Sequence, residues 1–488
     1  MKKFILLACM FTLAVCGGEG AGVKSVKAVG ESESTLTFHA FNFRTSSYYT
    51  INADLKGAGD HFYVYVEHGW TVDPTDIQDI INNFGIIYTK LRDSYGEEKP
   101  DVNGDSKVYI LLLDIQDDFN WPTMTGYTDG YFNPVDLYAN ERYSNKRKVL
   151  YMDIHPGLYL TGFYSPKSPN PNFRNTMAHE FQHLIHYNIK PSDDTWLNEA
   201  MSEVASFYAF NEPRWNRVEL FQRNGNHSNS LTNWDHELAD YAVVYMWAQY
   251  MADRFPNDVF RNILAVKNLK GKDSVEEYLS GHSDPLGKKL EFASVFRDWS
   301  IAMFFGNNTS VFTDNAVWTY KSINTWPGSY NGVSIPGLFK STNLNQAGFL
   351  SLDPWSIRYD WRNDTQTSSL RTRGESSTLQ ASFYTPTGGL TFNMTPNTPY
   401  TYDDTIFLIL QNTQDASYGA MPVNQPGPPT PSQASAASFR HYKTPPTPTE
   451  KLSAFSTEEL THGSAIRPIP VCMRDILSRQ AEEEMLSD

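Results

Sequence analysis

The segment 179–183, His-Glu-Phe-Gln-His, constrains the fold of this chain more than any other part of its sequence. Residues four positions apart project from the same face of an α-helix, so a helix here brings the rings of His179 and His183 together. Two imidazole nitrogens can then bind one Zn²⁺ ion at about 2.0–2.1 Å. Glu180 lies next to His179 and therefore beside the metal, where its carboxylate can act as a general base.

A third metal ligand is expected from Glu199, which lies 16 residues after His183. The turn at 190–194 ends the first helix and starts a second, and two antiparallel helices return Glu199 to the metal. Two histidines and one glutamate leave one coordination position for water, as a catalytic zinc requires, and predict one zinc per chain. Glu203, one turn further on, is expected to accept a hydrogen bond from the far nitrogen of a zinc-bound histidine.

His186 is a further histidine on the same predicted helix. The metzincin pattern needs Gly three positions and His six positions beyond His183, and these positions hold His186 and Ile189, so that pattern is absent. His186 remains an alternative ligand, seven positions after His179. The favoured interpretation is a histidine whose hydrogen bonds are satisfied within the core or at the surface.

These segments resemble those of a known group of enzymes. The pair of motifs 178–183 and 196–203 looks like that of the gluzincin metallopeptidases, and more narrowly like the hyicolysin-type neutral metalloproteases. The segments 240–245 and 296–299 give weaker support, and the resemblance spans roughly residues 60–310. It implies zinc endopeptidase activity outside the cell. The spacing between the motifs is shorter than in thermolysin-like gluzincins and argues against an intervening lobe.

Peptide hydrolysis also needs a hydrogen-bond donor for the developing oxyanion. Tyr241 is the first candidate, from its position in a predicted helix near 239–254 and from the family resemblance. Tyr245 and His236 are alternatives. These aromatic side chains are interpreted equally well as packing residues of the helix.

The expected fold class is α+β, with a mixed sheet and a helical, zincin-like catalytic domain. Alternation with a period of two predicts a β-rich N-terminal segment over 24–68. Asp73 and Pro74 predict the start of a helix. Continuous apolar runs at 108–113 and 149–154 predict strands that are buried on both faces.

The remaining chain divides by composition. Residues 69–335 are expected to form the gluzincin-like metallopeptidase domain, with helices near 173–189, 195–211 and 239–254. Short Thr-rich and aromatic runs predict a small β-sandwich-like module over 340–415. The segment 421–488 is rich in Pro, Ser and Thr and is expected to be a disordered tail.

Residues 1–16 have the pattern of an export signal, with Lys2 and Lys3 before an apolar stretch. Cys16, followed by two glycines, resembles a bacterial lipoprotein cleavage site, although Val15 departs from that pattern, so lipidation and simple release both stay open. The protein is therefore expected to be secreted or anchored at the bacterial cell surface. The chain has only 3 cysteines, and two of them lie in this leader, so the mature chain has no obvious disulfide framework.

A net charge of −15 without a basic patch argues against nucleic acid as a partner. Protein or peptide substrates are expected, and contact with a membrane only through a lipid on Cys16. Asp101, Asn103 and Asp105 could bind Ca²⁺. Because the segment lacks the glycine and the final glutamate of an EF-hand, a polar turn is the favoured interpretation.

The predicted function is hydrolysis of peptide bonds in extracellular proteins by a metal-activated water, with Glu180 as general base. The alternative is a surface adhesin or binding protein with a structural or vestigial metal site. The presence of Glu180 argues against it, because a structural zinc needs no general base. An aminopeptidase ranks below an endopeptidase, because no motif for a free α-amine is evident. Substrate, processing and oligomeric state stay open.

Overall fold

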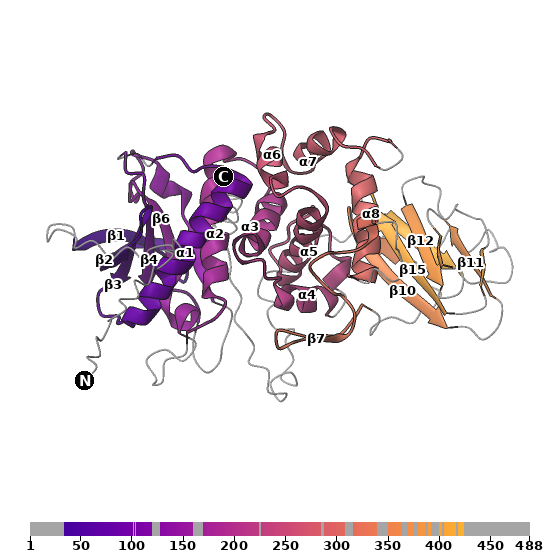
Figure 1. The fold of residues 1–488 in the computed structure, drawn as a ribbon, viewed down its shortest axis with the longest axis horizontal. Helices are drawn as coiled ribbons and strands as arrows, with labels where there is room; N and C mark the ends of the chain where they lie inside the picture. Colours follow the sequence, from indigo (N-terminus) through magenta and orange to yellow (C-terminus); the bar gives the residue numbers. More distant parts are fainter. Residues whose placement is uncertain are drawn as a thin grey trace, which may run out of the picture.

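The computed structural model describes residues 34–423, except 101, 103, 120–126, 160–168, 224–225, 285–286, 308–315, 339–349, 364–367, 374–378, 386–388, 392–399, 403–404 and 416–417. The predicted export signal with Cys16 lies outside the described residues, as does the predicted tail from residue 424 onward. Along the longest axis, the chain passes from a sheet through a helical region to a β-rich region (Figure 1). The fold is α+β, which confirms the predicted class.

The first sheet has six strands in the order β1-β2-β3-β4-β6-β5. Its strands β3, β4 and β6 run parallel, while β1 and β2 extend it antiparallel on one side and β5 lies antiparallel to β6 at the other edge. The β-rich segment predicted over 24–68 thus continues the sheet that carries the apolar runs at 108–113 and 149–154. The strands are β1 (Thr35–Asn42), β2 (Ser47–Ala58), β3 (Phe62–Glu67), β4 (Val108–Leu113), β5 (Gly130–Phe132) and β6 (Lys148–Asp153).

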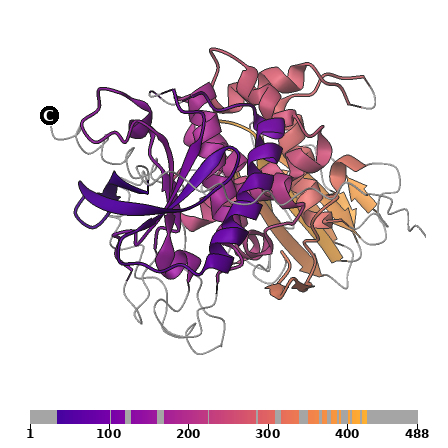
Figure 2. The same cartoon turned by 60° about the vertical axis from the view of Figure 1, so that its left-hand side comes forward.

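The apolar run of β4 is explained by burial on both faces of this sheet. Val108, Ile110 and Leu112 pack into the larger core, whereas Leu111 and Leu113 pack into a second cluster with side chains of β1 and β2. Successive side chains in a strand point to opposite faces, so burial of both faces requires a continuous run. Helix α1 (Pro74–Tyr95) begins at the predicted proline, and it covers the larger core together with α2 (Phe173–Ile189) (Figure 2).

Helices α2 and α3 (Thr195–Phe210) are the pair predicted around the metal motif. Helix α3 ends one residue before the predicted boundary because Asn211 adopts the left-handed conformation, with φ 55°, that commonly terminates helices. The helices that follow are α4 (Trp215–Gln222), α5 (Leu238–Arg254), α6 (Val259–Ala265), α7 (Gly271–Ser280) and α8 (Phe292–Phe305). In the described part of the chain, no helix combines the length and apolar character needed to cross a membrane.

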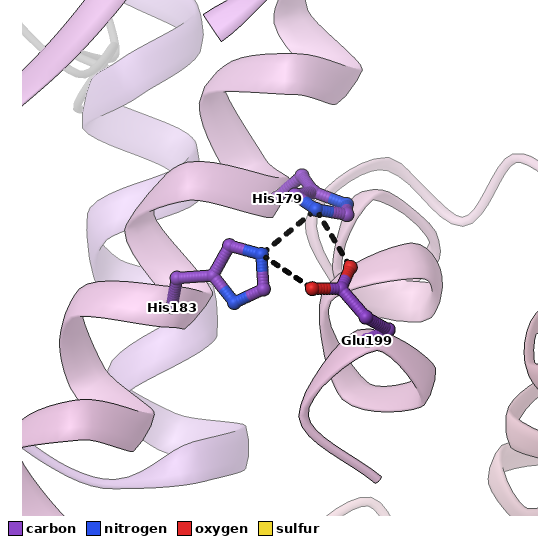
Figure 3. Close-up of side chains that lie close together, drawn as sticks. All are labelled: His179, His183 and Glu199. Atoms are coloured by element: carbon purple, nitrogen blue, oxygen red, sulfur yellow. Dashed lines mark hydrogen bonds and ion pairs between the residues drawn. The ribbon is translucent and has the colours of Figure 1, made fainter. Parts of the chain in front are cut away.

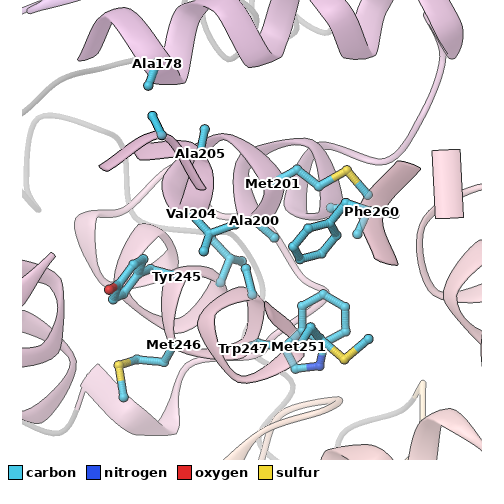
Figure 4. Close-up of a cluster of buried hydrophobic side chains, with 14 of the residues drawn as sticks. Ala178, Ala200, Met201, Val204, Ala205, Tyr245, Met246, Trp247, Met251 and Phe260 are labelled. Atoms are coloured by element: carbon cyan, nitrogen blue, oxygen red, sulfur yellow. The ribbon is translucent and has the colours of Figure 1, made fainter. Parts of the chain in front are cut away.

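A tight apolar core holds α3 between α2 and α5 (Figure 4). Alanines on the facing helices let the backbones approach closely, and large side chains of α5 and α6 fill the space beyond them. The residues are fully or almost fully buried: Ala178, Ala200, Met201, Val204, Ala205, Tyr245, Met246, Trp247, Met251 and Phe260. This packing fixes the rotation of α3 and therefore the face that it turns toward α2.

Beyond the hairpin of β7 (Gly328–Tyr330) and β8 (Val333–Ile335), two four-stranded antiparallel sheets follow, in the orders β10-β15-β12-β13 and β14-β11-β16-β9. The sheet β10-β15-β12-β13 is anchored on α8, because the Tyr359 hydroxyl donates to the Ser300 carbonyl (2.5 Å) and Gln411 donates to the Ser300 hydroxyl (2.7 Å). The strands are β9 (Leu350–Leu352), β10 (Ile357–Asn363), β11 (Ser368–Arg373), β12 (Leu379–Thr385), β13 (Gly389–Thr391), β14 (Tyr400–Tyr402), β15 (Thr405–Asn412) and β16 (Tyr418–Val423). Strand β16 extends past residue 421, where the tail was predicted to begin.

Candidate metal centre

Three side chains from two helices converge at one point (Figure 3). His179 and His183 lie one turn apart on α2, and their Nε2 atoms are 2.9 Å apart. From α3, the Oε2 atom of Glu199 lies 3.3 Å from His179 Nε2, and its Oε1 atom lies 3.5 Å from His183 Nε2. The structure therefore brings together the three residues that the sequence predicts as metal ligands.

The converging atoms fit a single metal ion. Ligand atoms at about 2.0–2.1 Å from one tetrahedral ion lie roughly 3.3 Å from one another, close to the separations found here. Glu199 is fully buried, and a carboxylate in that position is costly without a compensating cation or hydrogen bonds. Within the described residues, His179, His183 and Glu199 form the group of His, Cys, Asp and Glu side chains close enough to share a metal. Two imidazoles and a carboxylate are a donor set typical of catalytic zinc.

Glu203 lies behind His179, on the side away from the ligand cluster. Its Oε1 atom is 3.5 Å from His179 Nδ1, the far ring nitrogen. Arg214 donates to its Oε2 at 2.6 Å, and Arg217 donates to Oε2 at 2.7 Å and to Oε1 at 2.9 Å. Burial alone would raise the pKa of Glu203, but the two guanidinium groups outweigh burial and hold that pKa at about 2. Glu203 is therefore an ionised acceptor that faces His179, at the position expected for it.

The two arginines are site residues that the sequence does not reveal. Arg214 precedes α4 and its side chain is 9% exposed, whereas Arg217 lies within α4 and is buried. No motif marks them, because their partner Glu203 lies on a different helix. Their role becomes evident only from the hydrogen bonds that they donate to Glu203 of α3.

Ser202 is a second residue without an assigned role in the sequence prediction. Its Oγ atom lies 2.9 Å from His183 Nδ1, and its hydroxyl donates to Gln182 Oε1. Ser202 follows Glu199 by three positions, so helical periodicity places both side chains on the face that α3 turns toward α2. The spacing of Ser202 from Glu199 could therefore have predicted a side chain close to the metal ligands.

His186 lies outside the ligand cluster. It is fully buried, its Nε2 atom lies 3.1 Å from Asp193 Oδ2, and its Nδ1 atom lies 3.4 Å from Gln182 Nε2. The structure thus supports the favoured interpretation of a core histidine with satisfied hydrogen bonds.

Glu180 and Tyr241, the two predicted catalytic residues, are both buried near the cluster. Glu180 follows His179 on α2 and is 1% exposed. Tyr241 lies near the start of α5, where its ring packs edge-on against Trp234 and lies 5.4 Å from the guanidinium carbon of Arg217. Since Arg217 also binds Glu203, which faces His179, Tyr241 is connected to this metal ligand through two intervening side chains.

The alternatives to Tyr241 have defined contacts of their own. The Tyr245 hydroxyl accepts from the Arg214 backbone N–H (2.8 Å) and donates to Gln249 Oε1 (3.2 Å). His236 Nδ1 accepts from the indole N–H of Trp234 (3.2 Å). Both side chains thus have structural partners.

The suggested calcium segment is described only in part, because Asp101 and Asn103 lie outside the described residues. The carboxylate of Asp105 accepts hydrogen bonds from Lys107 N (2.9 Å) and from the Tyr109 hydroxyl (2.7 Å). These contacts are those of a polar turn before β4.

Helices α2 and α3 supply two histidines and a glutamate to one point, in a chain that also carries a mixed sheet. These features define a His₂Glu metal centre, the kind of site on which the predicted resemblance to gluzincins rests. The chain is 31% identical over 291 residues to the neutral metalloprotease ShpI of Staphylococcus hyicus. The match covers 56% of this chain and 64% of that protein, so it spans less than two thirds of the relative. No protein-family model matches the chain. The resemblance to hyicolysin-type metalloproteases is thereby confirmed as a distant homology.

Proposed function

We propose that this protein is a zinc-dependent endopeptidase that cleaves extracellular proteins. The observation that carries the proposal is the convergence of His179, His183 and Glu199, with Glu180 next to His179 on the same helix. The similarity to a neutral metalloprotease supports it, although that similarity covers only part of each protein.

His179, His183 and Glu199 would hold one zinc ion. When bound, zinc supplies a Lewis acid that polarises the scissile carbonyl and lowers the pKa of water. Glu180 takes a proton from the attacking water and delivers it to the amine that leaves. The ionised Glu203, whose Oε1 atom lies 3.5 Å from His179 Nδ1, favours the hydrogen of His179 on that nitrogen and so orients the ring.

Tyr241 is the proposed donor to the oxyanion of the tetrahedral intermediate. Its ring is positioned by Trp234 on one side and by Arg217, which also binds Glu203. The donor and the ring of His179 are thus held through a shared arginine–glutamate pair.

The test combines a metal count with digestion of an unfolded protein substrate, with and without chelator. We expect one zinc per chain, cleavage within the substrate chain, loss of cleavage with chelator, and its return with added zinc. Glu180→Gln keeps the size of the side chain, so this variant should bind zinc normally and lose about 10²- to 10⁴-fold in kcat.

Other outcomes would point elsewhere. Zinc binding without chelator-sensitive cleavage would favour a binding protein or adhesin. Release of single N-terminal residues would favour an aminopeptidase. Full cleavage by Glu180→Gln would overturn the assigned mechanism.

We also propose that the protein is exported by residues 1–16, with Cys16 as a candidate lipid attachment site. The apolar stretch after Lys2 and Lys3 supports export, and the two glycines after Cys16 support cleavage before that cysteine. Mass spectrometry of the mature N-terminus separates a diacylglycerol-modified Cys16 from an unmodified end.

A further inference from the structure

A continuous line of hydrogen-bonding groups leads away from the metal ligand His183. His183 Nδ1 lies 2.9 Å from Ser202 Oγ, and the Ser202 hydroxyl donates to Gln182 Oε1. The Nε2 atom of Gln182 lies 3.4 Å from His186 Nδ1, and His186 Nε2 lies 3.1 Å from Asp193 Oδ2. Each of these side chains is at least 95% buried.

The far end of this line is held by backbone groups. Asp193 Oδ1 accepts from the N–H groups of Asp194 (3.0 Å) and Gly271 (2.7 Å). Its Oδ2 faces His186 Nε2 and also lies 3.6 Å from Lys190 Nζ. Gly271 begins α7 with φ 46°, and a Cβ atom there would lie 2.0 Å from Asp194 Oδ2. The close approach of α7 to the turn therefore requires glycine. Although burial raises the pKa of Asp193, its bonds from His186 and Gly271 lower the pKa below its ordinary value.

The chemistry of the five side chains gives the line one direction. An ionised Asp193 only accepts, so His186 donates through Nε2–H, and a neutral His186 ring then accepts at Nδ1. Gln182 then donates its amide N–H to His186, which leaves Oε1 to accept from Ser202. The Ser202 hydroxyl has one hydrogen and two acceptors for it, Gln182 Oε1 and the Asn198 carbonyl, which lies 3.1 Å away. With its hydrogen on either of them, the Ser202 oxygen accepts from Nδ1–H of His183. A neutral His183 with its hydrogen on Nδ1 presents a lone pair at Nε2, the atom that faces the metal site.

We propose that Asp193, His186, Gln182 and Ser202 are positioning residues that keep His183 in the tautomer able to bind metal through Nε2. The inference rests on the proposed metal site, but it does not depend on proteolysis. In this proposal the orientation of His183 depends on the α2–α3 turn, which contains Asp193, and on the first residue of α7.

Asp193→Asn tests the direction of the line. The backbone N–H groups of Asp194 and Gly271 retain the oxygen of the substituted side chain, so its amide NH₂ turns to His186 Nε2. His186 must then accept at Nε2 and carry its hydrogen on Nδ1. Gln182 would have to rotate to accept that hydrogen, which turns its amide N–H toward Ser202. The Ser202 hydroxyl hydrogen then has His183 Nδ1 and the Asn198 carbonyl as its acceptors. Donation to His183 Nδ1 places the hydrogen of His183 on Nε2, where it competes with metal.

The experiment uses the full chain and Zn²⁺ in competition with a chromogenic chelator of known affinity. We expect Asp193→Asn and Ser202→Ala each to weaken zinc binding about 10- to 100-fold. Ser202→Thr keeps the hydroxyl and should restore most of the affinity. Ser206→Ala is the matched control for Ser202→Ala, because Ser206 is equally buried on α3 and its hydroxyl makes no hydrogen bond within the described part of the chain.

A second control and a spectroscopic readout separate positioning from a general loss of structure. Asp253→Asn changes another buried aspartate that holds backbone N–H groups, those of Lys321 and Ser322, and should leave zinc affinity unchanged. In ¹⁵N-histidine spectra of metal-free protein, His186 should carry its hydrogen on Nε2 in the wild type and on Nδ1 in Asp193→Asn. A purely structural role would not exchange these nitrogens.

The outcomes distinguish the two proposals. Unchanged zinc affinity in a folded Asp193→Asn variant, or His186 with its hydrogen on Nδ1 in the wild type, would overturn the positioning role. If the wild-type chain binds no zinc, both proposals fail. If zinc affinity follows the expected order but no protein substrate is cleaved, the positioning role stands and the endopeptidase proposal fails.

Discussion

His179 Nδ1 and Glu203 Oε1 lie 3.5 Å apart, and this contact joins the metal site to a buried pair of arginines. Arg214 and Arg217 keep Glu203 ionised, so its carboxylate is an acceptor at neutral pH. The orientation of one metal ligand therefore depends on a helix, α4, that supplies no ligand itself.

Removing the Glu203 carboxylate should weaken both stability and metal binding. Glu203→Ala leaves two buried guanidinium groups without their carboxylate, which typically costs about 3–5 kcal/mol of unfolding free energy. Glu203→Gln keeps an acceptor for His179 and should reduce zinc affinity less than Glu203→Ala does. Denaturant unfolding and chelator competition measure the two effects. Wild-type stability in Glu203→Ala would contradict the role of the cluster.

The same cluster predicts a loss of stability in acid. The pKa of Glu203 falls from an ordinary value of 4.5 to about 2 in the folded protein. A lowered folded pKa contributes stability that is complete above the unfolded value and is lost as pH falls from about 4.5 through 2. The contribution is roughly 3 kcal/mol. Unfolding free energies of the metal-free protein across this range should fall less steeply for Glu203→Gln than for the wild type; parallel curves would exclude the assignment.

Replacement of Tyr241 tests the oxyanion donor. Tyr241→Phe removes the hydroxyl but keeps the ring against Trp234, so kcat should fall about 10²- to 10³-fold while zinc affinity stays at the wild-type level. Tyr245→Phe is the matched comparison. It removes a hydroxyl bonded to the Arg214 backbone and to Gln249, and should cost about 1 kcal/mol of stability. If Tyr245→Phe instead shows the larger loss of kcat, Tyr245 becomes the donor.

Metal should stabilise the folded chain through Glu199. Zinc that binds only the folded state adds about 4 kcal/mol when its free concentration is 1,000 times the dissociation constant. Thermal unfolding should therefore shift upward with zinc and downward with chelator. Glu199→Gln should abolish the zinc-dependent shift. Because it removes a fully buried carboxylate, this variant should be at least as stable as the metal-free wild type. An undiminished zinc shift in Glu199→Gln would exclude Glu199 as a ligand.

The parts of the site that follow from local spacing could be predicted from the sequence. His179 and His183 are neighbours because an α-helix places residues four apart on one face, and a short turn at 190–194 returns Glu199 to them. Helix α2 was predicted with its observed bounds, because its apolar residues recur at helical spacing and its ends coincide with the turns. Glu203 followed from the same periodicity in α3.

Contacts between distant segments were decided only by the tertiary structure. Arg214 and Arg217 approach Glu203 because α4 packs against α5, which itself packs against α3. Asp193 is held in place because α7 approaches the α2–α3 turn. Helical periodicity assigns a side chain to a face, but the partner of that face depends on how the apolar cores of separate helices pack together. The sequence by itself thus determined the three converging ligands, the glutamate beside them and the periodicity that brings Glu203 to His179. Long-range packing determined the groups that hold Glu203 and Asp193 in place.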